Sequence, residues 1–266
     1  MQITQQSGGS RGPSYGEQLL SHVLSGSGIA VDSHVTGSGH TTDDVGTKDP
    51  TLTHLSVIDS TTANFADWPG WVPKALVQAL AQQGISRPWV HQARAASLAH
   101  DGSHVVVSTP TASGKSLAYQ LPILTALLTE PRATALYIAP TKALGADQIR
   151  AVATLTATRP EFSHLQPCAY DGDTEPDIRQ WARAHSRWIF TNPDMLHLGI
   201  LSTQTRWRHF LRNLRYVVID ECHHYRGVFG SHTGLVLRRL LRVARAAGAD
   251  PVVIASSATV ARPAES

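Results

Sequence analysis

Cysteine is scarce in this 266-residue sequence, and long apolar runs are missing. The two cysteines, Cys168 and Cys222, form no CxxC pair, so the pattern predicts neither a disulfide framework nor a zinc site. No stretch approaches the about 20 consecutive apolar residues that a membrane-spanning helix requires. The N-terminus also lacks the basic segment and apolar run of a secretory signal. We therefore expect a soluble protein of the reducing cytoplasm.

A strong excess of charge of either sign is also lacking. The 23 lysines and arginines slightly outnumber the 20 aspartates and glutamates, which gives a formal net charge of +3. This mild basicity is compatible with a polyanionic partner, but a solvated surface explains it equally well. Net charge therefore does not decide whether the protein binds nucleic acid.

Apolar residues are sparse at the start of the chain. The first sixty residues are rich in glycine, serine, threonine and aspartate, with hardly an apolar cluster after Leu24. Such a segment cannot bury enough surface to offset its conformational entropy, so we predict a mostly disordered tail over residues 1–62, with at most a short helix at 15–24. Residues 63–266 have the composition of a folded domain and a normal size for one α/β domain.

Short apolar runs alternate with helical patterns through the rest of the chain. The runs are continuously apolar, which is typical of strands covered on both faces. They occupy residues 104–109, 133–139, 166–170, 188–191, 216–220 and 251–256. Helical patterns occupy residues 116–128, 142–155, 177–184, 193–201 and 234–247. This order predicts an α/β fold with a parallel, doubly wound sheet flanked by helices.

Polar motifs stand where the predicted strands end. Ligands of open α/β sheets bind beyond the carboxyl ends of the strands. The chemistry is therefore expected at or just after Thr109, Ala139, Thr191, Asp220 and Ser256.

A phosphate-binding loop is predicted after the first of these strands, where TPTASGKS occupies residues 109–116. It approximates GxxxxGK[ST], in which backbone N–H groups of the loop and a helix N-terminus surround nucleotide phosphates. Gly114 permits close approach of the backbone, Lys115 neutralises the β- and γ-phosphates, and the Ser116 hydroxyl binds Mg²⁺. The pattern predicts ATP and Mg²⁺ as ligands, with the loop completed by Thr111, Ala112 and Ser113.

One position departs from this pattern, because Thr109 stands where the strict motif has its first glycine. The alternative interpretation is an ordinary helix start with Ser113 as its N-cap. The location of the segment between a buried strand and a helix favours the phosphate loop.

An apolar strand that ends in two carboxylates, Asp220 and Glu221, is the second candidate site. Such acids are costly to bury unless they open into a polar site. Beside a phosphate loop, Asp220 would bind Mg²⁺, usually through water, and Glu221 would orient and deprotonate the attacking water. His223 would hydrogen-bond toward neighbouring loops. The alternative is a helix capped by Asp220, with Glu221 in its first turn.

These motifs, taken in order, resemble the first RecA-like domain of superfamily 2 DExH-box helicases. DECH at residues 220–223 is similar to motif II, and TASGKS at 111–116 is similar to motif I. The other matching segments are GISRPWVHQ (84–92, the Q motif), APTKAL (139–144, motif Ia), TNPDM (191–195, motif Ib) and SSAT (256–259, motif III). Six motifs in the order of the family make the resemblance specific.

The resemblance implies further site residues. Gln92 would read the adenine edge of ATP, and Ser257, Ala258 and Thr259 would couple hydrolysis to domain movement. The phosphate backbone of a single strand would be held by Pro140, Thr141, Lys142, Thr191 and Pro193. Hydroxyl groups and a charge suit that task, although ordinary helix capping by the two threonines is the alternative.

Two stretches resemble one branch of this superfamily, the bacterial mitomycin-repair-factor type, which is related to the RecQ-four-like helicases. They are WPGWVP at residues 68–73 and HHYRGVFGSH at 223–232. The resemblance implies an ATP-dependent DNA helicase or translocase in DNA repair, with single-stranded DNA as its partner. An RNA helicase and a non-motor P-loop module that binds nucleic acid remain alternatives. Since the family requires a second RecA-like domain, absent from this sequence, we expect little or no unwinding by this chain alone.

Overall fold

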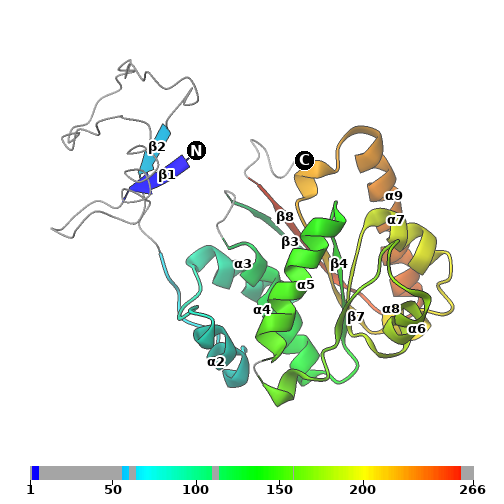
Figure 1. Ribbon diagram of the computed structural model, residues 1–266, viewed down its shortest axis with the longest axis horizontal. Coiled ribbons are helices and arrows are strands. Elements are labelled where there is room, and N and C mark those ends of the chain that lie inside the picture. The colour runs from blue at the N-terminus through cyan, green and yellow to red at the C-terminus, as the bar shows by residue number, and fades with distance from the viewer. Residues whose placement is uncertain (1, 6–55, 60–63, 110–113, 158, 259–266) are drawn as a thin grey trace, which may run out of the picture. The chain divides into compact units, whose positions relative to one another are not determined.

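The computed structural model of the chain describes residues 2–5, 56–59, 64–109, 114–157 and 159–258 (Figure 1). The chain divides into two units, Met1–Ala63 and Asn64–Ser266. In the first unit, β1 (Gln2–Gln5) pairs in parallel with β2 (Ser56–Asp59). The rest of the region predicted as a disordered tail, including residues 15–24, lies outside the described residues.

A six-stranded, wholly parallel sheet forms the centre of the second unit, in the order β3-β8-β7-β4-β6-β5. Its strands are β3 (Val105–Ser108), β4 (Thr134–Ile138), β5 (Pro167–Ala169), β6 (Trp188–Thr191), β7 (Leu214–Ile219) and β8 (Val252–Ser257). Each lies within two residues of a predicted strand at both ends. The predicted α/β fold with a parallel, doubly wound sheet is confirmed.

Helices cover both faces of this sheet (Figure 1). One face is covered by α2 (Lys74–Gln82), α3 (Val90–His100), α4 (Ser116–Thr129), α5 (Lys142–Ala157) and the 3-10 turn η1 (Pro160–Phe162). The other face is covered by α6 (Pro176–His185), the π-helix η2 (Leu196–Leu201), α8 (Arg208–Arg212) and α9 (Gly227–Ala246). The short helix α7 (Pro193–Met195) precedes η2, and the 3-10 turn η3 (Cys222–His224) follows β7.

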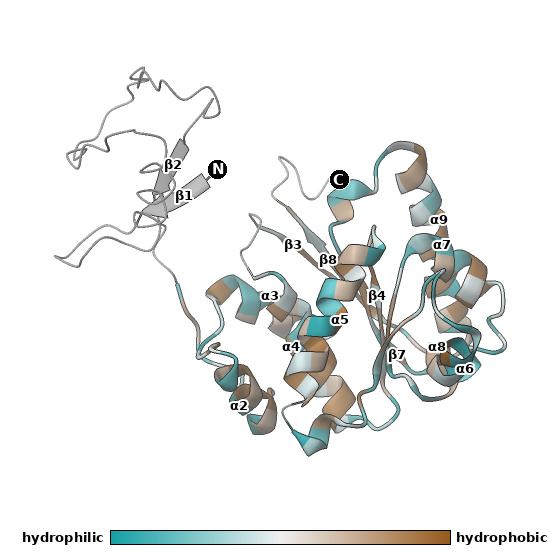
Figure 2. Cartoon of the chain, viewed as in Figure 1, coloured by the Kyte–Doolittle hydropathy of each residue, from teal (hydrophilic) through white to brown (hydrophobic). Residues whose placement is uncertain are grey.

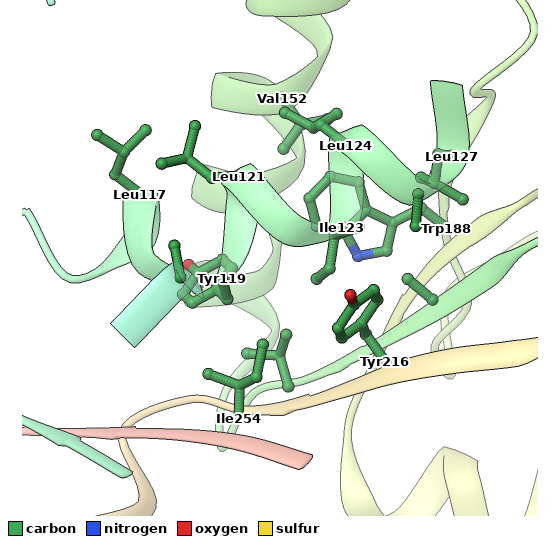
Figure 3. Packing of buried hydrophobic residues seen from close by; sticks show 14 of the residues in the cluster. Leu117, Tyr119, Leu121, Ile123, Leu124, Leu127, Val152, Trp188, Tyr216 and Ile254 are labelled. Atoms are coloured by element: carbon green, nitrogen blue, oxygen red, sulfur yellow. The ribbon is translucent and has the colours of Figure 1, made fainter. Parts of the chain in front are cut away.

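The central strands explain why their sequences are continuously apolar. Along β4, Ala135 and Tyr137 belong to the apolar cluster under α4, whereas Leu136 and Ile138 belong to the cluster under α9. Because successive side chains of a strand point to opposite faces, a strand covered on both sides has no polar face. Figure 3 shows the first cluster, where leucines of α4 pack over Trp188 and Tyr216. Apolar residues thus concentrate in the strands and on the helix faces toward them (Figure 2).

The prediction that each strand is covered on both faces is wrong for β3, which is an edge strand. Val105 and Val107 are buried, but the Val106 side chain between them is 57% exposed. Within the described residues β3 pairs only with β8, and its buried face packs against α3. The run of valines therefore marks β propensity rather than double burial.

Some helices differ from the predicted ones. The final helix begins at Gly227 rather than residue 234, because its first two turns contain glycines and the exposed Val228 and therefore show no apolar stripe. The pattern at 193–201, predicted as one helix, is α7 followed by the π-helix η2. Helices α2, α3 and α8 were not predicted. No helix among the described residues is long and apolar enough to cross a membrane.

Candidate active site and nucleic-acid surface

The predicted motifs meet at one edge of the sheet, because all strands run in parallel and their carboxyl ends lie together. The phosphate loop follows β3, motif Ia follows β4, and motif Ib follows β6. Motif II follows β7, and motif III is at the end of β8. The strand order brings β7 and β8 side by side, so motifs II and III are neighbours in space.

The described part of the phosphate loop includes Gly114, Lys115 and Ser116. Gly114 has φ +68°, in the left-handed region that favours glycine. Lys115 is nine-tenths buried, and its Nζ donates a hydrogen bond to the Thr109 carbonyl at 3.1 Å. This contact uses the backbone of Thr109, the residue that stands in place of the first glycine, rather than its side chain. Ser116 begins α4, while Thr111, Ala112 and Ser113 lie outside the described residues.

Gln92 connects α3 to this loop. Its Nε2 donates to the Gly114 carbonyl at 2.8 Å, and its Oε1 accepts from the Trp89 backbone N–H at 2.8 Å. The second contact is half of a capping box at the start of α3. Both ends of this buried amide therefore have partners within the protein, and one partner is the glycine of the phosphate loop.

Asp220 is the most enclosed acid of the site, at 5% exposure. Its Oδ1 accepts hydrogen bonds from the Ser256 hydroxyl and, at 2.9 Å, from the Glu221 backbone N–H. Its Oδ2 accepts from the Tyr137 hydroxyl. These donors come from β4, β8 and the end of β7, so the three central strands together fix the carboxylate. The alternative role as a simple helix cap does not account for these contacts.

Two buried tyrosines connect Asp220 to the helix that follows the phosphate loop. The ring of Tyr137 lies 5.8 Å from the ring of Tyr119 in the first turn of α4, and the Tyr119 hydroxyl donates to Gln148 Oε1 at 2.9 Å. Burial, followed by the charge of Asp220, raises the pKa of Tyr119 well above its usual value. Burial is also the main reason that the pKa of Tyr137 is raised, with smaller contributions from Tyr119 and Asp220. Both rings therefore stay neutral in the folded protein.

These raised pKa values predict a loss of stability in alkali. A tyrosine with a pKa near 10 when unfolded and a higher pKa when folded contributes its full stability below that pH and loses it above. We expect the free energy of unfolding to fall above pH 10 by about 1.4 kcal/mol per pH unit for each such tyrosine. Urea unfolding at pH 8, 10 and 11 checks this, and the slope should be shallower in Tyr137→Phe. Equal slopes for wild type and variant would contradict it.

Glu221 has an unusual backbone conformation, with φ +47°. This left-handed geometry costs a non-glycine residue on the order of 1–3 kcal/mol, and it turns the chain sharply after β7. The Glu221 Oε2 atom is buried and lacks a hydrogen-bond partner within the described part of the chain. It lies 3.2 Å from His223 Nδ1. The strained turn thus holds a second carboxylate next to Asp220, in contact with His223.

His223 joins motif II to motif III. Its Nδ1 accepts a hydrogen bond from the Ala258 backbone N–H at 3.3 Å and lies 3.4 Å from the Ser257 hydroxyl. The same Nδ1 atom lies 3.2 Å from Glu221 Oε2, so the imidazole contacts both the acid of motif II and the backbone of motif III. Thr259, the last predicted motif III residue, lies outside the described residues. The predicted contact of His223 with a neighbouring loop is present.

The residues predicted to hold a nucleic-acid strand divide into two groups. Thr141 and Lys142 are exposed, and Pro140 is half-buried beside them. Thr191 and Pro193 are buried, and the Thr191 hydroxyl donates to the Tyr170 carbonyl at 2.7 Å. The alternative role in helix capping holds for Thr141, whose hydroxyl accepts a hydrogen bond from the Leu144 N–H at 3.3 Å. It does not hold for Thr191, because the helix that follows, α7, is capped by Asn192.

A loop after β5, residues 171–174, belongs to this surface although it was not predicted. Asp173 Oδ2 lies 2.6 Å from Lys142 Nζ. The loop is braced by Arg179, which donates to the carbonyls of Asp171, Gly172 and Thr174 at 3.1, 3.0 and 2.7 Å. A DGD turn directly after a predicted strand was the available signal. The salt bridge joins this loop to motif Ia.

Comparisons with known proteins agree with this geometry. The chain is 44% identical over 192 residues to the ATP-dependent helicase HRQ1 of Saccharomyces cerevisiae, covering 72% of this chain and 18% of the relative. It is also 44% identical to YprA, an uncharacterized ATP-dependent helicase of Bacillus subtilis, over 74% of this chain and 26% of the relative. The crystal structure of the DUF1998 helicase MrfA bound to DNA matches with a TM-score of 0.75 and 42% identity, covering 78% of this chain and 29% of that one.

The chain therefore spans less than a third of the length of these relatives. The DEAD/DEAH box helicase family matches residues 89–266, from the end of the Q motif through motif III. The match includes the phosphate loop, the Asp220 carboxylate with its neighbours, and the surface of motifs Ia and Ib. This chain belongs to the DEAD/DEAH box helicase family and has the RecA-like fold of its ATP-binding domain.

Proposed function

We propose that this chain is the ATP-binding motor domain of a DNA helicase or translocase that acts in DNA repair. One observation carries the proposal: hydrogen bonds link the phosphate loop to the Q motif through Gln92, and motif II to motif III through Ser256 and His223. Movement at the nucleotide would therefore reach the end of β8. An isolated nucleotide-binding module does not need that second connection.

ATP would bind to the loop of residues 111–116 at the start of α4. Backbone N–H groups of Thr111, Ala112, Ser113 and Gly114 would surround its phosphates, and Gln92 would contact its adenine. The Lys115 ammonium, now bonded to the Thr109 carbonyl, would turn to the β- and γ-phosphates.

The residues at this edge also suit a hard cation such as Mg²⁺. Ser116 supplies a hydroxyl and Asp220 a carboxylate, and hard cations prefer oxygen ligands. The Asp220 carboxylate already accepts three hydrogen bonds. Its remaining lone pair would suit a contact with Mg²⁺ through a water molecule. When bound, Mg²⁺ would neutralise charge on the phosphates. The Glu221 carboxylate would orient a water molecule and take its proton. His223 lies 3.2 Å from that carboxylate and accepts a hydrogen bond from the Ala258 N–H of motif III, so it would link the acid to motif III.

The exposed charge at the carboxyl edge of the sheet would hold a single strand. Lys142 and Thr141 present an ammonium and a hydroxyl, and the buried Thr191 and Pro193 shape the adjoining turn. A phosphate group would replace the carboxylate of Asp173 on Lys142, so nucleic-acid binding would open the salt bridge described above. DNA is favoured over RNA because the MrfA structure, at 42% identity, contains DNA.

Full motor activity would involve a second RecA-like domain that closes over ATP. In related NTPases an arginine supplied from outside the phosphate loop contributes roughly 10³–10⁵ in turnover. We expect weak ATP and DNA binding, and little hydrolysis, from this chain alone.

Two variants of the Lys142–Asp173 pair, one that removes the positive charge and one that removes the negative charge, test the proposal that this surface binds a single strand. We expect Lys142→Ala to weaken binding of a labelled (dT)20 strand by roughly 3- to 10-fold, since one phosphate contact is lost. We expect Asp173→Asn to strengthen it, because Lys142 is released from its carboxylate. Fluorescence anisotropy measures both.

Lys74→Ala is the matched control, because Lys74 is an exposed lysine of α2 on a different part of the domain. A loss in that control equal to the loss in Lys142→Ala would refute the assigned site. The same assay with (rU)20 distinguishes the RNA-helicase alternative, which predicts tighter binding of the RNA strand than of the DNA strand.

A further inference from the structure

An unusual concentration of arginine lies on the outer side of α9 and α8, away from the motifs described above. Two adjoining hollows, each of about 570 Å³, share Arg242. The first is also lined by Arg238, Arg239 and Arg245, and the second by Arg208. We refer to these five arginines and the hollows between them as the arginine groove.

The groove carries charge of a single sign. No acidic residue lines either hollow, and from residue 222 to 249 the sequence has no aspartate or glutamate. Arg239 is held by the Leu201 carbonyl at 2.9 Å, and Arg245 pairs with Asp250 at 2.9 Å. Among the described residues, the other three guanidinium groups make neither an ion pair nor a side-chain hydrogen bond. Such a surface attracts a polyanion rather than a partner of mixed charge.

The spacing of the arginines suits a regular row of phosphates. Arg238, Arg242 and Arg245 are at positions i, i+4 and i+7 of α9, so they lie along one side of the helix. At 1.5 Å per residue they extend over about 10 Å. Guanidinium groups bind phosphate oxygens in pairs, and their charge persists at all physiological pH values.

The lining residues favour a duplex over a single strand. Proteins that hold single strands combine charge with aromatic side chains on which bases stack. The groove is lined by arginine, leucine, alanine, valine, threonine and glutamine, without an aromatic residue. It therefore offers contacts to phosphates and none to bases, and in a duplex the phosphates are the accessible part.

The groove also lies at the other end of the fold from the single-strand surface. Helix α9 begins after motif II, at the carboxyl edge of the sheet, and ends before the start of β8. Its arginines are in its second half, toward the amino ends of the strands (Figure 1). We propose that the arginine groove is a second nucleic-acid site, which binds the phosphate backbone of duplex DNA without sequence preference.

A matched pair of double variants tests this proposal. Arg238→Gln/Arg242→Gln removes two charges from the groove, and Arg94→Gln/Arg150→Gln removes two from exposed positions of α3 and α5 on the other face of the sheet. Binding of a labelled 20-base-pair DNA duplex to the 266-residue chain is measured by anisotropy over a range of salt concentrations.

We expect the groove variant to lose roughly 10-fold in duplex affinity and the slope of log affinity against log salt to shrink by about 2. The control should lose less than about 2-fold. Arg238→Lys/Arg242→Lys keeps both charges and should lose less affinity than the glutamine variant, and thermal unfolding of the glutamine variant at the wild-type temperature would exclude a folding defect as the cause. Equal losses in both glutamine variants, or no duplex binding by the wild-type chain, would overturn the proposal. So would a loss seen only with duplex RNA.

The test is independent of the proposed motor function. Binding of (dT)20 should stay unchanged in the groove variant, because that strand is assigned to Lys142 on the other edge. A chain that binds duplex DNA through the groove but fails to bind ATP or (dT)20 would support the groove and refute the motor proposal.

Discussion

Lys115→Ala is expected to lower the affinity of this chain for ATP by about 100-fold or more. In the proposed complex its ammonium exchanges the Thr109 carbonyl for the β- and γ-phosphates. Hydrogen bonds to charged groups contribute about 1.5–3 kcal/mol each, and 1.4 kcal/mol corresponds to tenfold in affinity. Two such contacts account for the expected loss. Isothermal titration with Mg²⁺-ATP measures it.

The control is Lys74→Ala, which removes the same charge from the exposed surface of α2. Its ATP affinity should match the wild type within about twofold, as expected for a surface change away from the site. The free energy of unfolding of Lys115→Ala is measured beside that of the wild type, because Lys115 is buried and its loss also removes the hydrogen bond to the Thr109 carbonyl. ATP affinity unchanged in Lys115→Ala would exclude the phosphate-loop assignment.

Gly114→Ala is expected to weaken ATP binding by roughly 10- to 100-fold for a steric reason. A Cβ atom at Gly114 would lie 2.5 Å from Gln92 Nε2, which donates to the Gly114 carbonyl. The alanine would therefore displace Gln92 or the loop, in addition to the cost of its positive φ. Both the proposed adenine contact and the phosphate cradle would be disturbed together.

Gly84→Ala separates the effect of the clash with Gln92 from the effect of the positive φ. Gly84 has φ +83°, so it has similar backbone strain, but a Cβ atom there meets nothing within 4 Å. We expect both alanine variants to lose about 1 kcal/mol of stability from the positive φ, and only Gly114→Ala to lose ATP affinity. Titration with Mg²⁺-ATP and thermal unfolding of both variants check this. Similar ATP affinities in the two variants would show that the contact with Gln92 is unimportant for the nucleotide.

The sequence predicted the framework of the domain because its signals are local. The run around Tyr137 has no polar face, since β4 is covered on both sides and its one hydroxyl, on Thr134, is buried, and its ends are set by a polar loop and by Pro140. The phosphate loop and DECH are short contiguous motifs placed by the strands before them. Their location could be derived from strand ends alone, given that the sheet is parallel.

The contacts within the site could not be predicted in the same way. Tyr137 and Ser256 reach Asp220 only because β4, β7 and β8 are adjacent in the sheet, and strand order is not encoded in the spacing of residues along the chain. The Lys142–Asp173 pair likewise depends on where the loop after β5 folds back. Gln92 could be assigned to ATP by resemblance, but its bond to the Gly114 carbonyl required the structure.

The left-handed backbone at Glu221 has a consequence for attempts to engineer this domain. Glycine would adopt that conformation without strain and would remove a buried carboxylate oxygen that has no hydrogen-bond partner among the described residues, although it lies 3.2 Å from His223 Nδ1. Selection for heat resistance alone would thus favour replacing the acid that the proposed chemistry needs. Any library designed to stabilise the fold should keep position 221 fixed, because the most stable sequence there is not the active one.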